Sequence, residues 1–203
     1  EPDIVLVLGD MYTCSSGAET MKNAAGFVCS IAAEGYPTYF VPGDHDISEQ
    51  YLADLRSGGV HVMDYKCETV SVNGSEIRIM GIDNAYFSPT FDLHNEFYND
   101  PDRFDLLMAH IPNHAKYAEF GADLTVCADT HGGMVQLPLI GEVFDPLNGK
   151  LLPEIFGSGQ VFDKGWFDCG GGKMFITSGL GGYPMPIRLF NRPEIVTIEI
   201  KPE

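Results

Sequence analysis

"DLTVCADTHGG", residues 123–133, joins a short apolar run to an aspartate and a histidine two positions apart, followed by two glycines. The run has the length and composition of a strand buried within a sheet. Local folding requires neither Asp129 nor His131 at its end. Because ligands of α/β proteins bind beyond the carboxyl ends of the strands, polar residues in this position indicate a binding site.

Three other apolar runs end in polar residues in the same way. They are "DIVLVLGD" (residues 3–10), "TYFVPGDHD" (residues 38–46) and "FDLLMAH" (residues 104–110). For any one of these residues alone, a loop or helix cap is an equally good interpretation. The carboxyl ends of parallel strands share one edge of a sheet, so we expect the four ends together to form one metal site. The six candidate residues are Asp10, Asp44, His45, His110, Asp129 and His131.

The rest of the chain has the pattern of an α/β domain. Apolar residues recur with helical spacing over residues 18–33, and Ser48 is the expected N-cap of a short helix ending at Arg56. Alternating residues on either side of Asn73-Gly74 predict a β-hairpin. The remaining expected elements are a helix over 115–120 and closing strands over 173–179 and 194–200. This order predicts mixed sheets layered between helices.

Two long stretches, residues 84–103 and 139–172, have no clear periodicity. Irregular segments of this length usually border a site, and we expect these two to do so.

Length and net charge limit the possible domain organisation and partners. The 203 residues, 44% of them hydrophobic, are enough for a single domain over residues 1–203. The net charge of −17 opposes contact with nucleic acid or an anionic membrane, so neither is an expected partner. Most of this charge is expected to form an acidic surface, while a few carboxylates converge on a cation.

The cysteines are scattered. They show no C-x-x-C spacing, which argues against both a disulfide framework and a structural zinc site. We expect small buried apolar groups at these positions. The five cysteines are Cys14, Cys29, Cys67, Cys127 and Cys169.

The first residues, "EPDIVLVLGD", enter a strand almost at once and include no initiator methionine. We therefore expect the chain to be a piece of a longer protein. The segment before residue 1 would determine whether the protein is cytoplasmic, membrane-attached or exported. The sequence gives no signal for the oligomeric state.

Oxygen and imidazole ligands without cysteine suit divalent ions such as Mn²⁺, Mg²⁺, Fe²⁺ or Zn²⁺. A carboxylate that bridges two such ions is the usual arrangement for phosphoester hydrolysis, in which the ions generate hydroxide. A histidine just outside the ligand set can protonate the leaving oxygen.

These residues resemble the motifs of the calcineurin-like metallophosphoesterase family, which are D-x-H, G-D, G-N-H-D/E, a lone H and G-H-x-H. Gly9-Asp10 matches the second motif, "GDHD" at 43–46 the third, His110 the fourth, and "ADTHGG" at 128–133 the last. The tail at 176–200, "ITSGLGGYPMPIRLFNRPEIVTIEI", resembles a bacterial, often membrane-attached or exported branch. The resemblance implies a four-layer αββα sandwich of two mixed sheets flanked by helices.

The chain departs from the family pattern in three places. The first strand with its D-x-H motif is missing, Asp44 replaces asparagine, and Asp129 replaces the first histidine of the last motif. The resemblance implies one ion bound by Asp10, Asp44, His110 and Asp129. A second ion would have Asp10, as the bridge, and His131. The two added carboxylates favour Mn²⁺ or Mg²⁺, with Fe²⁺ or Zn²⁺ as alternatives.

The leading functional hypothesis is a metal-dependent phosphoesterase. Metal-activated hydroxide would attack a small phosphomonoester or phosphodiester, Asp10 would bridge the ions, and His45 would stabilise the phosphate or act as an acid. The alternative is a catalytically degenerate module that keeps one ion, and an oxygen-ligated Ca²⁺-binding domain is a weaker third. The other histidines are interpreted as surface or core residues outside the site: His61, His94 and His114.

Overall fold

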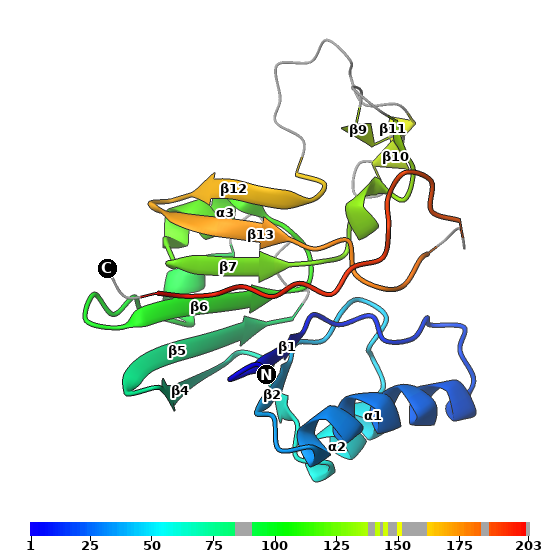
Figure 1. The fold of residues 1–203 in the computed structure, drawn as a ribbon, viewed down its shortest axis with the longest axis horizontal. Coiled ribbons are helices and arrows are strands. Elements are labelled where there is room, and N and C mark those ends of the chain that lie inside the picture. Colours follow the sequence, from blue (N-terminus) through cyan, green and yellow to red (C-terminus); the bar gives the residue numbers. More distant parts are fainter. Residues whose placement is uncertain are drawn as a thin grey trace.

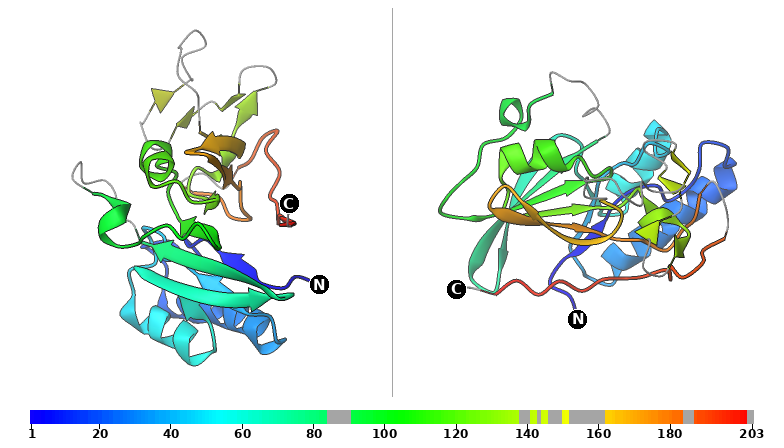
Figure 2. Two further views of the ribbon diagram at one scale, coloured as in Figure 1. Left: turned by 90° about the vertical axis from the view of Figure 1, so that its left-hand side faces the viewer. Right: turned by 90° about the horizontal axis from the view of Figure 1, so that it is seen from above.

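The structure is a computed structural model that describes residues 1–83, 91–137, 141–142, 144–145, 150–151, 162–183 and 187–201. Two β-sheets stack face to face, and helices cover their outer faces (Figures 1 and 2). The expected four-layer α/β sandwich is therefore confirmed.

The smaller sheet consists of three parallel strands in sequence order: β1 (Val5–Val7), β2 (Thr38–Phe40) and β3 (His61–Val62). Helices α1 (Ala18–Ala33) and α2 (Glu49–Ser57) pack on its outer face (Figure 1). The predicted cap of α2 is confirmed, since Ser48 Oγ accepts a hydrogen bond from the backbone N–H of Tyr51 at 3.3 Å.

The larger sheet has six strands in the order β12-β13-β7-β6-β5-β4. Its four central strands are parallel, and the two edge strands β4 and β12 run antiparallel to their neighbours. The predicted hairpin joins β4 to β5, with Asn73 and Gly74 at the positive φ angles of 51° and 86° that its turn requires. The strands are β4 (Lys66–Val72), β5 (Ser75–Ile82), β6 (Phe104–Ala109), β7 (Leu124–Cys127), β12 (Gly165–Cys169) and β13 (Gly172–Ile176).

Three apolar layers hold the sheets and helices together. Ile79 and Met108 belong to the layer between the two sheets, and Val28 and Phe40 to the layer beneath α1 and α2. The third layer includes Tyr117 of helix α3 (His114–Phe120), which covers the other face of the larger sheet. Burial on both faces explains why the central strands are continuous apolar runs.

The remaining described elements are short. They are η2 (Leu93–Asn95), η3 (His131–Gly133), β8 (Gln136–Leu137), β9 (Gly141–Glu142), β10 (Phe144–Asp145) and β11 (Lys150–Leu151).

Two sequence predictions about strands are wrong. The expected closing strand over 194–200 is not a strand, because none of the described residues forms a hydrogen-bonded ladder with it. The segment runs extended along the sheets, where Ile198 joins the layer between them (Figure 1). Conversely, β12 lies inside a stretch that was expected to be irregular, and it pairs with β13 through a turn at Gly170 and Gly171.

The expectation for the cysteines is correct only in part. All five are free, but only Cys127 and Cys169 are buried, whereas Cys14 and Cys67 are exposed. Much of the two long stretches, namely residues 84–90, 138–140, 143, 146–149 and 152–161, lies outside the described residues, so their position beside the site stays a prediction. In the part of the chain that the structure describes, no helix is long and apolar enough to cross a membrane.

Candidate metal centre

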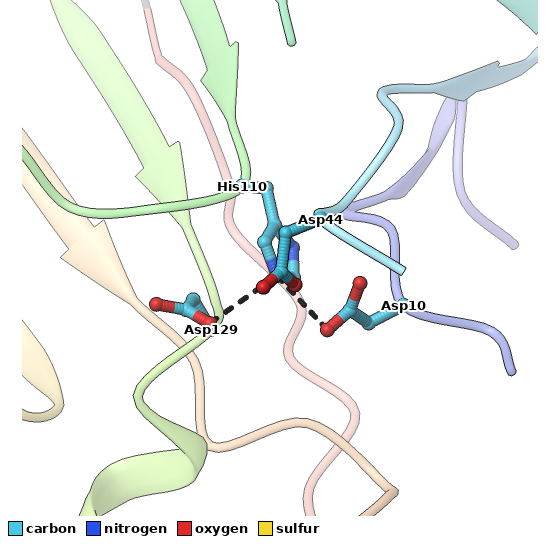
Figure 3. Close-up of side chains that lie close together, drawn as sticks. All are labelled: Asp10, Asp44, His110 and Asp129. Carbon is cyan, nitrogen blue, oxygen red and sulfur yellow. Dashed lines mark ion pairs between the residues drawn. The ribbon is translucent and has the colours of Figure 1, made fainter. Parts of the chain in front are cut away.

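Four of the predicted ligands come together at the carboxyl ends of four strands. Asp10 follows β1, Asp44 follows β2, His110 follows β6 and Asp129 follows β7. One ligand atom from each lies within 4.8 Å of the ligand atoms of the other three. Figure 3 shows the three carboxylates grouped around the imidazole. The site therefore draws one pair of ligands from each sheet.

His110 is the buried centre of this group. Its Nε2 atom is 3.3 Å from Asp10 Oδ2, 3.5 Å from Asp129 Oδ1 and 4.0 Å from Asp44 Oδ1. The His110 side chain is 1% exposed, whereas that of Asp44 is 51% exposed. The group thus opens to solvent on the side of Asp44.

The orientation of His110 fits a bound cation. Its Nδ1 atom lies 2.5 Å from the carbonyl oxygen of Leu8, so Nδ1 carries a hydrogen and donates it. In the neutral ring Nε2 then presents a lone pair toward carboxylate oxygens, and this buried atom has no hydrogen-bond partner among the described residues. A lone pair facing three carboxylates is unfavourable unless a proton or a metal cation lies between them, and these donors suit a divalent ion.

The pKa values in the metal-free chain reflect this arrangement. Burial lowers the pKa of His110, but the Asp10 and Asp129 carboxylates beside Nε2 favour the protonated ring, outweigh burial and raise the value to about 10. Burial raises the pKa of Asp10, and the contact with His110 reverses that effect and lowers it. The pKa of Asp44 is raised by burial and by the negative charge of Asp10. Without a metal ion, a proton on His110 supplies the positive charge.

Two glycines allow the loops after β1 and β2 to approach each other. A Cβ atom on Gly9 would overlap the backbone of Gly43, and a Cβ atom on Gly43 would overlap the Asp10 carboxylate. Asp10 and Asp129 themselves have positive φ angles of 55° and 54°, which few residues other than glycine adopt. The backbone is therefore strained where these ligands are presented.

Asp46 ties the same two loops together, and its role was not predicted. Its Oδ2 atom accepts hydrogen bonds from the backbone N–H groups of Asp10 at 2.5 Å and Gly43 at 2.9 Å. The side chain is 2% exposed, and burial raises its pKa to about 6 despite the two hydrogen bonds. A carboxylate here fixes the position of Asp10 relative to the loop that carries Asp44.

His131, the fifth predicted ligand, lies outside the group of four ligand atoms. It is close enough to interact electrostatically with Asp129 and Asp10, but burial and the positive charge of Arg188 lower its pKa. Arg188 donates hydrogen bonds to backbone carbonyls, among them Ser178 O at 2.5 Å. Its guanidinium thus holds the loops beside His131.

The predicted catalytic residue His45 lies beside the group. Its backbone N–H donates to Asp10 Oδ1 at 3.1 Å, and its ring packs edge-on against Tyr183 with the centroids 4.8 Å apart. Its Nδ1 atom contacts Cys14, a residue that sequence reasoning did not connect with the site.

The other histidines lie outside the group, as expected. His61 pairs with Glu68 at 2.6 Å and His94 with Asp92 at 3.0 Å, so each has a carboxylate partner that the sequence did not reveal. His114 stacks on Phe162 with the ring centroids 4.3 Å apart.

Comparisons with known proteins agree with this geometry. The sequence model of the calcineurin-like phosphoesterases matches residues 1–133. Two curated relatives are each 25% identical to this chain. The uncharacterized metallophosphoesterase YkuE of Bacillus subtilis matches 99% of this chain and 68% of its own length. The phosphodiesterase YaeI of Escherichia coli matches 98% of this chain and 71% of its own length.

A solved structure shows the same fold. It is the sulfate thiohydrolase SoxB of Thermus thermophilus in complex with glycerol, which is 15% identical with a TM-score of 0.50. The match covers 85% of this chain and 33% of SoxB. The family match extends from the amino-terminal end through the last of the four ligand loops. The chain belongs to the calcineurin-like phosphoesterase family, whose members are metal-dependent hydrolases.

Proposed function

We propose that the protein is a metal-dependent phosphoesterase that hydrolyses a small phosphomonoester or phosphodiester. The observation that carries the proposal is the buried Nε2 atom of His110, which has no hydrogen-bond partner among the described residues and faces three carboxylates. A purely structural histidine at this depth would be expected to use both nitrogens in hydrogen bonds.

In this proposal Asp10, Asp44, His110 and Asp129 hold one divalent ion. Asp10 and His131 would contribute to holding a second ion. The lowered pKa of His131 supports this role, because a neutral imidazole offers a lone pair to a metal.

An ion held by these residues would polarise phosphoryl oxygens and activate water for attack. The protein residues provide the remaining chemistry. Asp10 orients His45 through the backbone N–H of that residue, which places the imidazole beside the ligand group. His45 either donates a hydrogen bond to a phosphoryl oxygen or protonates the leaving oxygen.

The experiment uses the complete protein with Mn²⁺ or Mg²⁺ and two substrates, bis(p-nitrophenyl) phosphate and p-nitrophenyl phosphate. Because the E. coli relative is a phosphodiesterase, the diester is the first substrate to test. We expect metal-dependent release of p-nitrophenol that a chelator abolishes and that Asp10→Asn reduces by at least about 100-fold. The control is Glu68→Gln, which alters the exposed His61–Glu68 pair away from the ligand loops.

The alternative is a metal-binding module without catalysis. The observation in its favour is that the compact group contains the donors for only one ion, with His131 outside it. Stoichiometric metal binding without hydrolysis of either ester would establish this alternative and exclude the phosphoesterase.

A further inference from the structure

Two groups of Cys14 contact the same nitrogen of His45. The backbone N–H of Cys14 donates to His45 Nδ1 at 3.3 Å, and Cys14 Sγ lies 2.9 Å from that atom. Because a backbone N–H can only donate, Nδ1 is an acceptor and the hydrogen of the neutral ring is on Nε2. Among the described residues no hydrogen bond occupies Nε2, which remains available to a ligand.

We propose that Cys14 is a positioning residue for His45, holding Nδ1 so that the Nε2–H group serves the phosphoryl substrate. The proposal rests on the proposed phosphoesterase function and adds to it a residue that acts through His45.

The loop that carries Cys14 is well fixed. The Ser16 N–H donates to Thr13 O at 2.8 Å, and the Thr13 N–H donates to Ser16 Oγ at 3.1 Å, which closes a turn around Cys14. Before this turn Tyr12 is 7% exposed, and its hydroxyl accepts a hydrogen bond from the Ser48 N–H at 3.2 Å. The backbone of the loop that carries Cys14 is thus anchored to the core beneath α1 and α2.

Other contacts fix His45 only in part. The hydrogen bond to Asp10 holds its backbone, and Tyr183 packs against the ring at an interplanar angle of 77°. Neither contact distinguishes the two ring nitrogens. Among the described residues only Cys14 does so: its backbone N–H makes Nδ1 the acceptor, and its thiol, at 2.9 Å, is the side-chain contact that holds this nitrogen.

The contact also explains why an exposed cysteine stands at this position. Cys14 and Cys67 are both exposed cysteines, but Cys67 lies on β4 of the larger sheet, where Arg78 Nη2 is 3.9 Å from its Sγ. Cys67 therefore provides a matched control for loss of an exposed thiol.

The test is a double-mutant cycle in the complete protein, with bis(p-nitrophenyl) phosphate and Mn²⁺. Cys14→Ala removes the thiol contact and keeps the backbone N–H of residue 14. We expect it to lower kcat about 10-fold with KM and bound metal unchanged, because one of the two contacts that orient Nδ1 is lost. Cys14→Ser should restore much of the activity, because its hydroxyl can donate to Nδ1. In a His45→Ala background, Cys14→Ala should have no further effect. Cys67→Ala should retain full activity.

An equal loss from Cys14→Ala with and without His45 would overturn the proposal, because the thiol would then act independently of the imidazole. A second measurement does not depend on turnover. Nitrogen-15 NMR of His45 should show an unprotonated Nδ1 whose resonance shifts in Cys14→Ala, and unchanged resonances would also overturn the proposal. If the unmodified protein hydrolyses neither ester, the proposed function fails, and the NMR experiment still decides whether Cys14 holds the ring.

Discussion

The imidazole of His110 donates from one nitrogen to Leu8 and turns the other toward three carboxylates. In the metal-free chain its pKa of about 10 lies above the ordinary value of 6.5. Protonated His110 therefore stabilises the fold fully below pH 6.5, and this contribution is lost as the pH rises through 10. A metal ion bound by Nε2 would replace that proton and maintain a positive charge at the centre of the group.

This replacement predicts that metal binding at pH 8 releases about one proton. Calorimetric titration of the metal-free protein with Mn²⁺, repeated in buffers of different ionisation enthalpy, measures the number of protons released per ion bound. The release should fall to about half a proton near pH 10, where His110 is half deprotonated before binding. Binding without proton release at pH 8 would show that Nε2 is not a ligand.

A second prediction at the residue scale separates catalysis from metal binding. His45 touches Asp10 through its backbone, and its side chain is not one of the four grouped ligands. We expect His45→Ala to lower turnover roughly 10²–10⁴-fold, the range for general acid–base groups, with metal content near normal. Metal analysis beside the kinetic assay checks both parts. Loss of the metal would mean that His45 is a ligand.

The sequence predicts which residues come together in the candidate metal centre better than it predicts the residues that support them. Asp10, Asp44, His110 and Asp129 each follow an apolar run, a pattern that is local and visible. The supporting contacts join residues far apart in the chain: Asp46 lies 36 positions from Asp10, and Cys14 lies 31 positions from His45. No local pattern marks such contacts, because they arise only when two loops meet.

At the scale of elements, prediction was accurate where an element is determined by its own sequence. Helix α1 has the predicted bounds because its apolar face and Gly35, the glycine just beyond its end, are both local signals. A strand also requires a partner. Residues 194–200 alternate in the way a strand does but have no ladder with any described neighbour, whereas β12 is a strand because β13 pairs with it.

The close approach of the β1 and β2 loops gives a prediction at this scale. Gly43→Ala would place a methyl group against the Asp10 carboxylate, so we expect it to weaken Mn²⁺ binding by at least about 10-fold. The matched control is Gly74→Ala in the β4–β5 hairpin, where no atom lies within 4 Å of the added carbon. There the positive φ angle should cost about 1–2 kcal/mol of stability and leave Mn²⁺ affinity unchanged. Equal Mn²⁺ affinity in both variants would contradict the tight packing of the two loops.

The fold of the whole molecule places the candidate metal centre where the two sheets meet. Asp10 and Asp44 follow strands of the smaller sheet, while His110 and Asp129 follow strands of the larger one. The apolar layer between the sheets sets the distance between these pairs. Because the chain carries a net charge of −17, a divalent ion at this junction also relieves repulsion among carboxylates that the fold brings together.

Metal preference follows from this donor set, which combines three carboxylates with one imidazole. Oxygen-rich sites suit Mg²⁺ and Mn²⁺, whereas additional imidazole ligands favour Zn²⁺ and Fe²⁺. We therefore expect the complete protein to be activated best by Mn²⁺ or Mg²⁺. Asp129→His exchanges one carboxylate for an imidazole and should shift the preference toward Zn²⁺ or Fe²⁺. Metal analysis of each protein purified without added ions, followed by metal titration of the metal-stripped protein, measures the preference of the unmodified chain and of Asp129→His. Tightly bound stoichiometric zinc in the unmodified protein would contradict the argument, because it would show that the three carboxylates do not determine which ion binds.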